Sequence, residues 1–123
     1  MKTILVVDDD PSIRFLLRLI FESAGYEVIE AQHGVAALIR IKEALPDLVV
    51  TDMMMPVMDG GELIAHLRSD PRTAGLRILA VTGNPEARES AGQADIVMGK
   101  PFHQSSLLAN VNSLLSEQRL SAG

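Results

Sequence analysis

The chain of 123 residues contains no cysteine and no tryptophan, and aromatic side chains make up only 3% of it. The absence of cysteine excludes a disulfide framework, thiol chemistry and any thiolate metal site. Because 47% of the residues are hydrophobic and few of these are aromatic, the core is expected to be aliphatic. The length fits a single domain, since domains typically have about 100–150 residues.

Basic clusters and long apolar runs are also missing from the sequence. Eleven lysine and arginine residues stand against 16 aspartate and glutamate residues, and the formal net charge is −5. This balance provides no basic patch for nucleic acid. The first apolar run, residues 4–7, is too short for a signal peptide, and no segment is long enough to span a membrane. These absences favour a cytoplasmic protein that binds neither nucleic acid nor membranes.

Short apolar runs alternate with segments of helical periodicity along the chain. Strands are expected at residues 4–7, 26–31, 47–51, 77–82 and 95–98. A helix is expected after each strand, and the fourth helix, at residues 85–91, has room for only about two turns. This alternation predicts an α/β fold with a parallel sheet and helices on both of its faces.

The apolar residues of the first two helices are expected to face the core. They are Ile13, Leu16, Leu17, Ile20 and Ala24 in the first helix and Val35, Leu38, Ile39 and Leu45 in the second. Asp10 is expected to cap the first helix, because it precedes Pro11 and its side chain can accept from a free backbone N–H. The polar C-terminal segment is expected to fray.

Polar side chains follow four of the expected strands, at the point where each strand ends. Asp8 and Asp9 follow the first strand, Asp52 the third, Thr82 the fourth and Lys100 the fifth. Ligands of open α/β sheets bind outside the carboxyl ends of the strands, so these side chains are expected to converge. Carboxylates so close together need a cation, and Mg²⁺ prefers such oxygens. A carboxylate there can attack phosphorus, with a lysine and a hydroxyl beside the phosphoryl oxygens.

Five motifs in this order resemble the receiver domain of two-component response regulators, including chemotaxis regulators. They are Val6-Val7-Asp8-Asp9-Asp10, Val50-Thr51-Asp52-Met53-Met54-Met55-Pro56, Met58-Asp59-Gly60, Thr82-Gly83 and Lys100-Pro101-Phe102. The resemblance covers residues 2 to about 115. It implies a flavodoxin-like (βα)5 doubly wound sandwich with a five-stranded parallel sheet in the order 2-1-3-4-5. We therefore expect a receiver domain at residues 1–118, and from the sequence itself a frayed tail at 119–123 and no output domain.

The resemblance implies a role for each polar residue at the strand ends. Asp52 is the expected phosphoacceptor, while Thr82 and Lys100 are expected to contact phosphoryl oxygens. The expected ligands of Mg²⁺ or Mn²⁺ are Asp8, Asp9, Asp52 and the backbone carbonyl of Met54. The phosphoryl group is expected to come from a histidine kinase or a histidine phosphotransferase. The chain, a monomer or weak dimer, would then switch its binding to a protein partner, and it would catalyse only its own phosphorylation and slow dephosphorylation.

Two features depart from the usual pattern of this family. Val97 stands three residues before Lys100, where an aromatic residue is usual, and the segment from Thr82 to Lys100 is shorter than usual. In the family this aromatic side chain moves inward when the neighbouring hydroxyl contacts the phosphoryl group. Because Val97 cannot report in the same way, the output of the domain is the least transferable part of the resemblance.

Two other functions are compatible with the sequence. Residues 4–12 loosely resemble the Asp-x-Asp motif of haloacid-dehalogenase-type phosphohydrolases, with Asp8 as nucleophile and Asp10 as acid. That hypothesis leaves Asp52 unexplained, and the chain is too short for a cap domain. The second alternative is a receiver-like binding module that is not phosphorylated, for which Val97 and the short fourth helix leave room.

Overall fold

The computed structural model of the chain describes residues 1–84 and 91–122. Its elements in order are β1 (Thr3–Val7), α1 (Pro11–Ser23), β2 (Glu27–Ala31), α2 (Gly34–Glu43), β3 (Leu48–Asp52), α3 (Gly60–Ser69), β4 (Arg77–Thr82), β5 (Ile96–Gly99) and α5 (Gln104–Ala122). All five predicted strands are confirmed, each boundary within one residue. The expected fourth helix lies, except for its last residue, outside the described residues.

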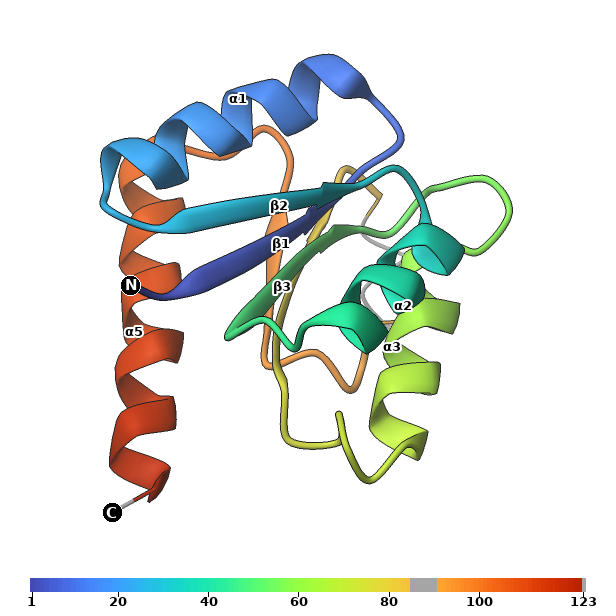
Figure 1. Ribbon diagram of the computed structural model, residues 1–123. Helices are drawn as coiled ribbons and strands as arrows, with labels where there is room; N and C mark the ends of the chain where they lie inside the picture. The colour runs from blue at the N-terminus through green and yellow to red at the C-terminus, as the bar shows by residue number, and fades with distance from the viewer. Residues whose placement is uncertain (85–90, 123) are drawn as a thin grey trace.

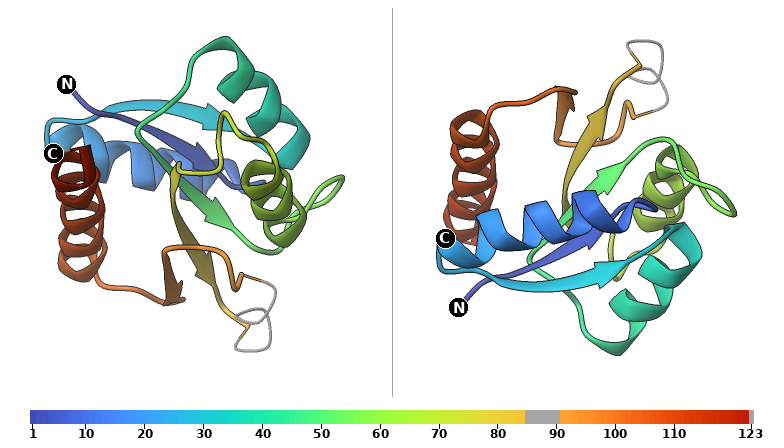
Figure 2. Two further views of the ribbon diagram at one scale, coloured as in Figure 1. Left: turned by 90° about the horizontal axis from the view of Figure 1, so that it is seen from below. Right: turned by 90° about the horizontal axis from the view of Figure 1, so that it is seen from above.

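The five strands form one parallel sheet in the order β2-β1-β3-β4-β5, which confirms the predicted flavodoxin-like topology. Figures 1 and 2 show that α1 and α5 cover one face of this sheet, while α2 and α3 cover the other. The order places β1 beside β3 in the middle of the sheet, and β4 on the far side of β3. The carboxyl ends of these strands therefore meet at one edge.

Each face of the sheet has its own aliphatic core. Ile4 and Val6 pack with α1 and α5, whereas Leu5 and Val7 pack with α2 and α3, because successive side chains of a strand point to opposite faces. Strands buried on both faces read as continuous apolar runs, which explains why residues 4–7 carry no polar side chain. Phe21 is the largest fully buried side chain, and the others in that group are aliphatic, as expected.

Helix α1 begins as expected but is rotated from its expected orientation. The Asp10 side chain accepts a hydrogen bond from the backbone N–H of Ser12 at 2.8 Å, with Pro11 in the first turn, so the predicted cap is confirmed. The buried residues of the helix are Leu17, Ile20 and Phe21. Leu16, expected in the core, is 46% exposed, and Ala24 is also exposed. The predicted apolar stripe of α1 was therefore wrong at two of its positions.

Helix α2 packs closely through two small residues, in addition to larger apolar ones. Its buried residues are Gly34, Ala37 and Ile41. Of the predicted stripe, Leu38 is half-buried and packs against the core, as expected. Val35, Ile39 and Leu45, which follows the helix, are exposed, so the prediction was wrong at these three positions. The Gly34 N–H donates to the Met58 carbonyl at 3.1 Å, and a Cβ at position 34 would lie 2.6 Å from Met58 Cγ. This close contact ties the start of α2 to the loop between β3 and α3.

Helix α5 is the longest helix and completes the core on the α1 side of the sheet. Its residues Leu107, Val111, Leu114 and Leu115 are buried there. The expected frayed tail at residues 119–123 overlaps the last turn of α5, and its fraying stays a prediction. Neither α5 nor any other helix in the described part of the chain is long and apolar enough to cross a membrane.

Val57→Gly is expected to raise the free energy of unfolding by about 1 kcal/mol. Val57 has a φ of 69° and is 75% exposed, so a β-branched residue adopts a left-handed backbone without burial to offset its strain. Glycine removes this strain but loses more conformational entropy on folding. Urea unfolding measures the difference. Gly25→Ala, at φ 93° in open space, should destabilise by a similar amount, and an unchanged or lower midpoint for Val57→Gly would contradict the strain.

Candidate functional site

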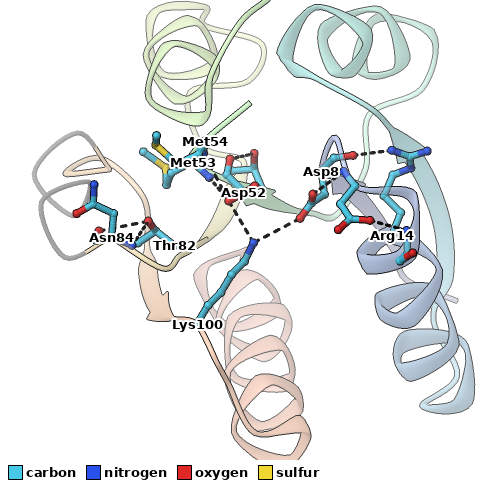
Figure 3. Close-up of polar contacts among 11 residues, drawn as sticks. Asp8, Arg14, Asp52, Met53, Met54, Thr82, Asn84 and Lys100 are labelled. Carbon is cyan, nitrogen blue, oxygen red and sulfur yellow. Dashed lines mark hydrogen bonds and ion pairs between the residues drawn. The ribbon is translucent and has the colours of Figure 1, made fainter. Parts of the chain in front are cut away.

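Three acidic side chains meet at the carboxyl edge of the sheet. Asp8 and Asp9 follow β1 and Asp52 ends β3, and each offers an oxygen such that all three oxygens lie within 4.8 Å of one another. Their proximity follows from the pairing of β1 with β3, in which Val7 is opposite Thr51. Figure 3 shows Asp8 and Asp52 on either side of a common space. The structure therefore brings together the three acids that the sequence singled out.

Lys100 reaches this acidic group from the end of β5. Its Nζ lies 3.4 Å from Asp52 Oδ1 and 3.7 Å from Asp8 Oδ2 (Figure 3). The Lys100 N–H donates to the Thr82 carbonyl at 2.9 Å, and the Lys100-Pro101 peptide bond is cis. The hydrogen bond to the end of β4 thus holds the main chain of Lys100, while its ammonium group lies between two carboxylates.

Thr82 lies at the same edge, but its hydroxyl bonds to the segment that follows it. The side chain is 2% exposed. Its Oγ1 accepts from the Asn84 N–H at 3.1 Å and donates to the Asn84 carbonyl at 3.3 Å. In this arrangement the hydroxyl closes a turn after β4, next to the acids and Lys100 (Figure 3).

Backbone N–H groups of the loop that follows β3 contact the Asp52 carboxylate. Its Oδ1 accepts from the Met53 N–H at 2.8 Å and makes a long contact of 3.5 Å with the Met54 N–H. Met53 is buried, whereas the Met54 side chain is 63% exposed beside the site. A Cβ at Gly60 would lie 2.4 Å from the Asp52 carbonyl, so only glycine lets the start of α3 approach so closely.

Electrostatics at this edge favour a bound cation. Burial raises the pKa of Asp8; the Asp10 N–H lowers it, Asp52 and Asp9 raise it, and Lys100 lowers it. Three carboxylates face one lysine, which leaves two negative charges without a partner in the cluster. The donors are all hard oxygens, the type that Mg²⁺ and Mn²⁺ prefer over softer ligands. The residues present therefore fit a divalent cation.

Arg14 contacts the site and was not anticipated from the sequence. Its Nη1 donates to the backbone carbonyl of Asp8 at 2.6 Å (Figure 3). An arginine one turn after two acids was the only available signal. Its partner is a backbone carbonyl, and no pattern of side chains reveals such a target.

Comparison with known proteins identifies the family. The family model for the response regulator receiver domain matches residues 4–112. The chain is 35% identical over 119 residues to the DNA-binding dual master transcriptional regulator RpaA of Synechocystis, covering 94% of this chain and 49% of that protein. It is 39% identical over 119 residues to the phosphate regulon regulator PhoB of Rhizobium meliloti, covering 94% and 52%. The chain thus spans about half the length of these curated relatives.

Solved structures agree with this assignment. A CheY-like receiver domain from Methanospirillum hungatei has a TM-score of 0.91 at 30% identity and covers 98% of each chain. The response regulator TrrA from Thermotoga maritima, crystallised in complex with Mg²⁺-BeF, has a TM-score of 0.86 at 34% identity, covering 93% of this chain and 99% of that one.

Neither alternative function finds support in these matches. The hydrolase hypothesis needs Asp10 as an acid, yet the Asp10 side chain is exposed and caps α1. The curated relatives are transcriptional regulators rather than enzymes, and receiver domains are signalling domains. Its sheet topology, the acidic cluster at the carboxyl ends of its strands and these matches show that the chain belongs to the response regulator receiver domain family.

Proposed function

We propose that this chain accepts a phosphoryl group on Asp52 from a phosphorylated histidine of a kinase or phosphotransferase. The observation that carries the proposal is the position of Asp52. Its carboxylate is 9% exposed, lies 3.4 Å from the Lys100 ammonium and shares an edge with the oxygens of Asp8 and Asp9. A largely buried carboxylate beside a lysine and two further acids suits the transfer of an anionic group.

In the proposed reaction an Asp52 oxygen forms a bond to phosphorus while the bond from phosphorus to the donor's imidazole nitrogen breaks. The electron pair of that bond stays with the imidazole. The bonds to the Met53 N–H and Lys100 hold Oδ1, so Oδ2 is assigned as the attacking oxygen. Mg²⁺ or Mn²⁺, held by Asp8, Asp9, Asp52 and the Met54 carbonyl, would offset the negative charge of the carboxylates and the phosphoryl oxygens.

Lys100 and Thr82 are the proposed contacts of the transferred group. The Lys100 ammonium supplies a charge beside Asp52. Thr82 would exchange the hydrogen bond that its hydroxyl donates to the Asn84 carbonyl, 3.3 Å long, for one donated to a phosphoryl oxygen, while it continues to accept from the Asn84 N–H. Because hydroxyl rotation is easy and one hydrogen bond replaces another, this exchange has a small net cost.

The proposed output is a switch in binding to a protein partner. The net charge of −5 argues against direct contact between this domain and nucleic acid, although relatives carry DNA-binding names. We expect a cytoplasmic monomer or weak dimer. Val97, half-buried on β5 opposite Ala80, takes the place of the usual aromatic residue, so the output is proposed to use another surface.

Acetyl phosphate as phosphodonor tests the proposal. Intact mass and peptide mapping are expected to find one phosphoryl group on the peptide containing Asp52, in Mg²⁺ but not in EDTA. Asp52→Asn should lose this adduct. Asp59→Asn should keep it, because Asp59 is the capping acid of α3 in the same loop and asparagine caps equally well. A phosphoryl group on Asp8, or none from either acetyl phosphate or a cognate kinase, would refute the assignment.

Met54→Asn is expected to speed decay of the acyl phosphate about tenfold, which corresponds to about 1.4 kcal/mol in the barrier. Met54 follows Asp52 by two residues and is 63% exposed beside it. Its thioether accepts hydrogen bonds only weakly, so it cannot orient an attacking water, whereas an amide can. Phosphoprotein decay after removal of the phosphodonor measures the rate. Met54→Leu serves as the control and should decay at the unsubstituted rate. If Met54→Asn decays no faster than the unsubstituted chain, the argument is contradicted.

A further inference from the structure

Arg14 links the loop that carries Asp8 and Asp9 to the adjacent strand β2. Its Nη1 donates to the Asp8 carbonyl at 2.6 Å, and its Nε donates to Glu30 Oε1 at 3.1 Å. The Arg14 side chain is only 18% exposed, so both bonds are shielded from water. Figure 3 shows it extending from the start of α1 toward the end of β1.

The contacts of Asp8 hold its main chain on both sides. Its N–H donates to the Ala31 carbonyl at 3.2 Å, its side chain accepts from the Asp10 N–H at 2.9 Å, and its carbonyl accepts from Arg14. The Asp8 carbonyl and the Asp9 N–H belong to one planar peptide group. Fixing the carbonyl oxygen therefore also fixes the direction in which the chain leaves toward Asp9.

Glu30 anchors Arg14 without adding net charge to the site. Its second carboxylate oxygen accepts from Arg18 Nη1 at 2.6 Å, and Arg18 also pairs with Glu22 at 3.2 Å. The two arginines and two glutamates form a neutral network across α1 and β2. Within it, Arg14 donates to the backbone carbonyl of Asp8, whereas Arg18 shares Glu30 and, among the described residues, bonds to the side chains of Glu22 and Glu30.

We propose that Arg14 is a positioning residue for the divalent-cation site, because its bond to the Asp8 carbonyl orients the Asp8–Asp9 segment for metal binding. The inference rests on the function proposed above. Groups that orient metal ligands typically alter metal affinity or activity about 10–100-fold when removed. Loss of the positioning bond should weaken Mg²⁺ binding. Loss of a positive charge near three carboxylates would by itself tighten Mg²⁺ binding, so the two effects of removing Arg14 have opposite signs.

Arg14→Met provides the test, because it keeps most of the apolar stem and removes both bonds. Binding of Mg²⁺ alone to the full chain can be followed by NMR of the backbone amides, without any phosphodonor. We expect about tenfold weaker affinity in Arg14→Met. Arg18→Met is the matched control: it makes the same charge change and loses the same Glu30 partner but leaves the Asp8 carbonyl bonded, so its affinity should equal or exceed that of the unsubstituted chain.

Phosphorylation provides a second measurement. Arg14→Met should need more Mg²⁺ for half-maximal rate yet approach the unsubstituted rate at saturation, and Arg14→Lys should recover part of the affinity. The same amide spectra report folding, and Arg14→Lys carries the comparison if Arg14→Met unfolds. Equal affinity in the Arg14 and Arg18 variants would overturn this inference alone. Absence of Mg²⁺ binding by the unsubstituted chain would overturn the proposed function together with it.

Discussion

Lys100→Met is expected to slow phosphorylation of Asp52 about 100-fold, since loss of one charged donor at a site of developing negative charge costs about that much. The Lys100 ammonium lies 3.4 Å from Asp52 and 3.7 Å from Asp8. The ammonium group therefore lies beside the space where an incoming phosphoryl group would carry its charge. Methionine has a similar length and cannot provide that charge.

The same substitution should tighten Mg²⁺ binding about tenfold. Two unit charges about 4 Å apart interact by about 1–4 kcal/mol, depending on their exposure to water. The ammonium group competes with a metal ion for the same two carboxylates, so its removal leaves them more attractive to the metal. A faster reaction cannot follow from this tighter binding at saturating Mg²⁺, because the metal site is then full in both proteins.

Two measurements on one variant separate these effects. Phosphoryl incorporation from acetyl phosphate is compared at saturating Mg²⁺, and Mg²⁺ affinity is measured by titration without phosphodonor. Lys42→Met is the control, because Lys42 is exposed near the C-terminal end of α2 and makes the same charge change. A loss of both phosphorylation and Mg²⁺ affinity in Lys100→Met would mean that the lysine acts by holding the fold rather than by its charge.

The strands and their polar ends could be predicted because parallel sheets impose a simple pattern. Strands buried on both faces need continuous apolar runs, as in residues 48–50, and the residue after each run falls at the shared carboxyl edge. The strand order came from the family resemblance, and it places β1 beside β3. The approach of Asp8, Asp9 and Asp52 follows from these two facts, whereas Lys100 follows β5 and reaches the acids with its side chain.

The orientation of the helices was harder to predict. Six of the residues from 15 to 21 in α1 are apolar, so periodicity alone does not show which face meets the sheet. The burial of Phe21 and exposure of Leu16 settle its rotation. In α2, Gly34 and Ala37 are buried, and at position 34 only glycine allows the close approach to Met58. A search for hydrophobic residues does not single out glycine and alanine as contact positions, although their small size determines the packing here.

Asp8→Asn is expected to make the metal-free protein about 1 kcal/mol more stable at neutral pH, a typical gain when a strained functional group is removed. Asp8 is 3% exposed, and burial raises its pKa above the ordinary value of 3.8. Its ionised form therefore costs stability in the folded state. Asparagine retains an oxygen to accept the Asp10 N–H, which now bonds to Asp8 Oδ1 at 2.9 Å, but carries no charge.

The pH dependence follows from the direction of that pKa shift. Because the pKa of Asp8 is higher in the folded chain, the folded state binds more protons than the unfolded state between the two values. The stability from this group is full below about 3.8 and is lost as pH rises through the folded pKa. Asp8→Asn should remove this loss of stability with rising pH. The difference in the free energy of unfolding between Asp8→Asn and the unsubstituted chain should therefore grow with pH and then level off.

Urea unfolding in EDTA at a series of pH values measures this difference. In Mg²⁺ the order of stability of the two proteins is expected to reverse. Mg²⁺ stabilises whichever folded state binds it. The unsubstituted chain should therefore gain more stability from Mg²⁺ than Asp8→Asn, which has lost an acid of the cluster.

Asp9→Asn provides the comparison, since Asp9 is exposed and its loss should weaken Mg²⁺ binding without stabilising the metal-free chain. Equal stabilisation by both substitutions in EDTA would attribute the effect to net charge, whereas a gain confined to Asp8→Asn would locate the cost in the burial of this one carboxylate.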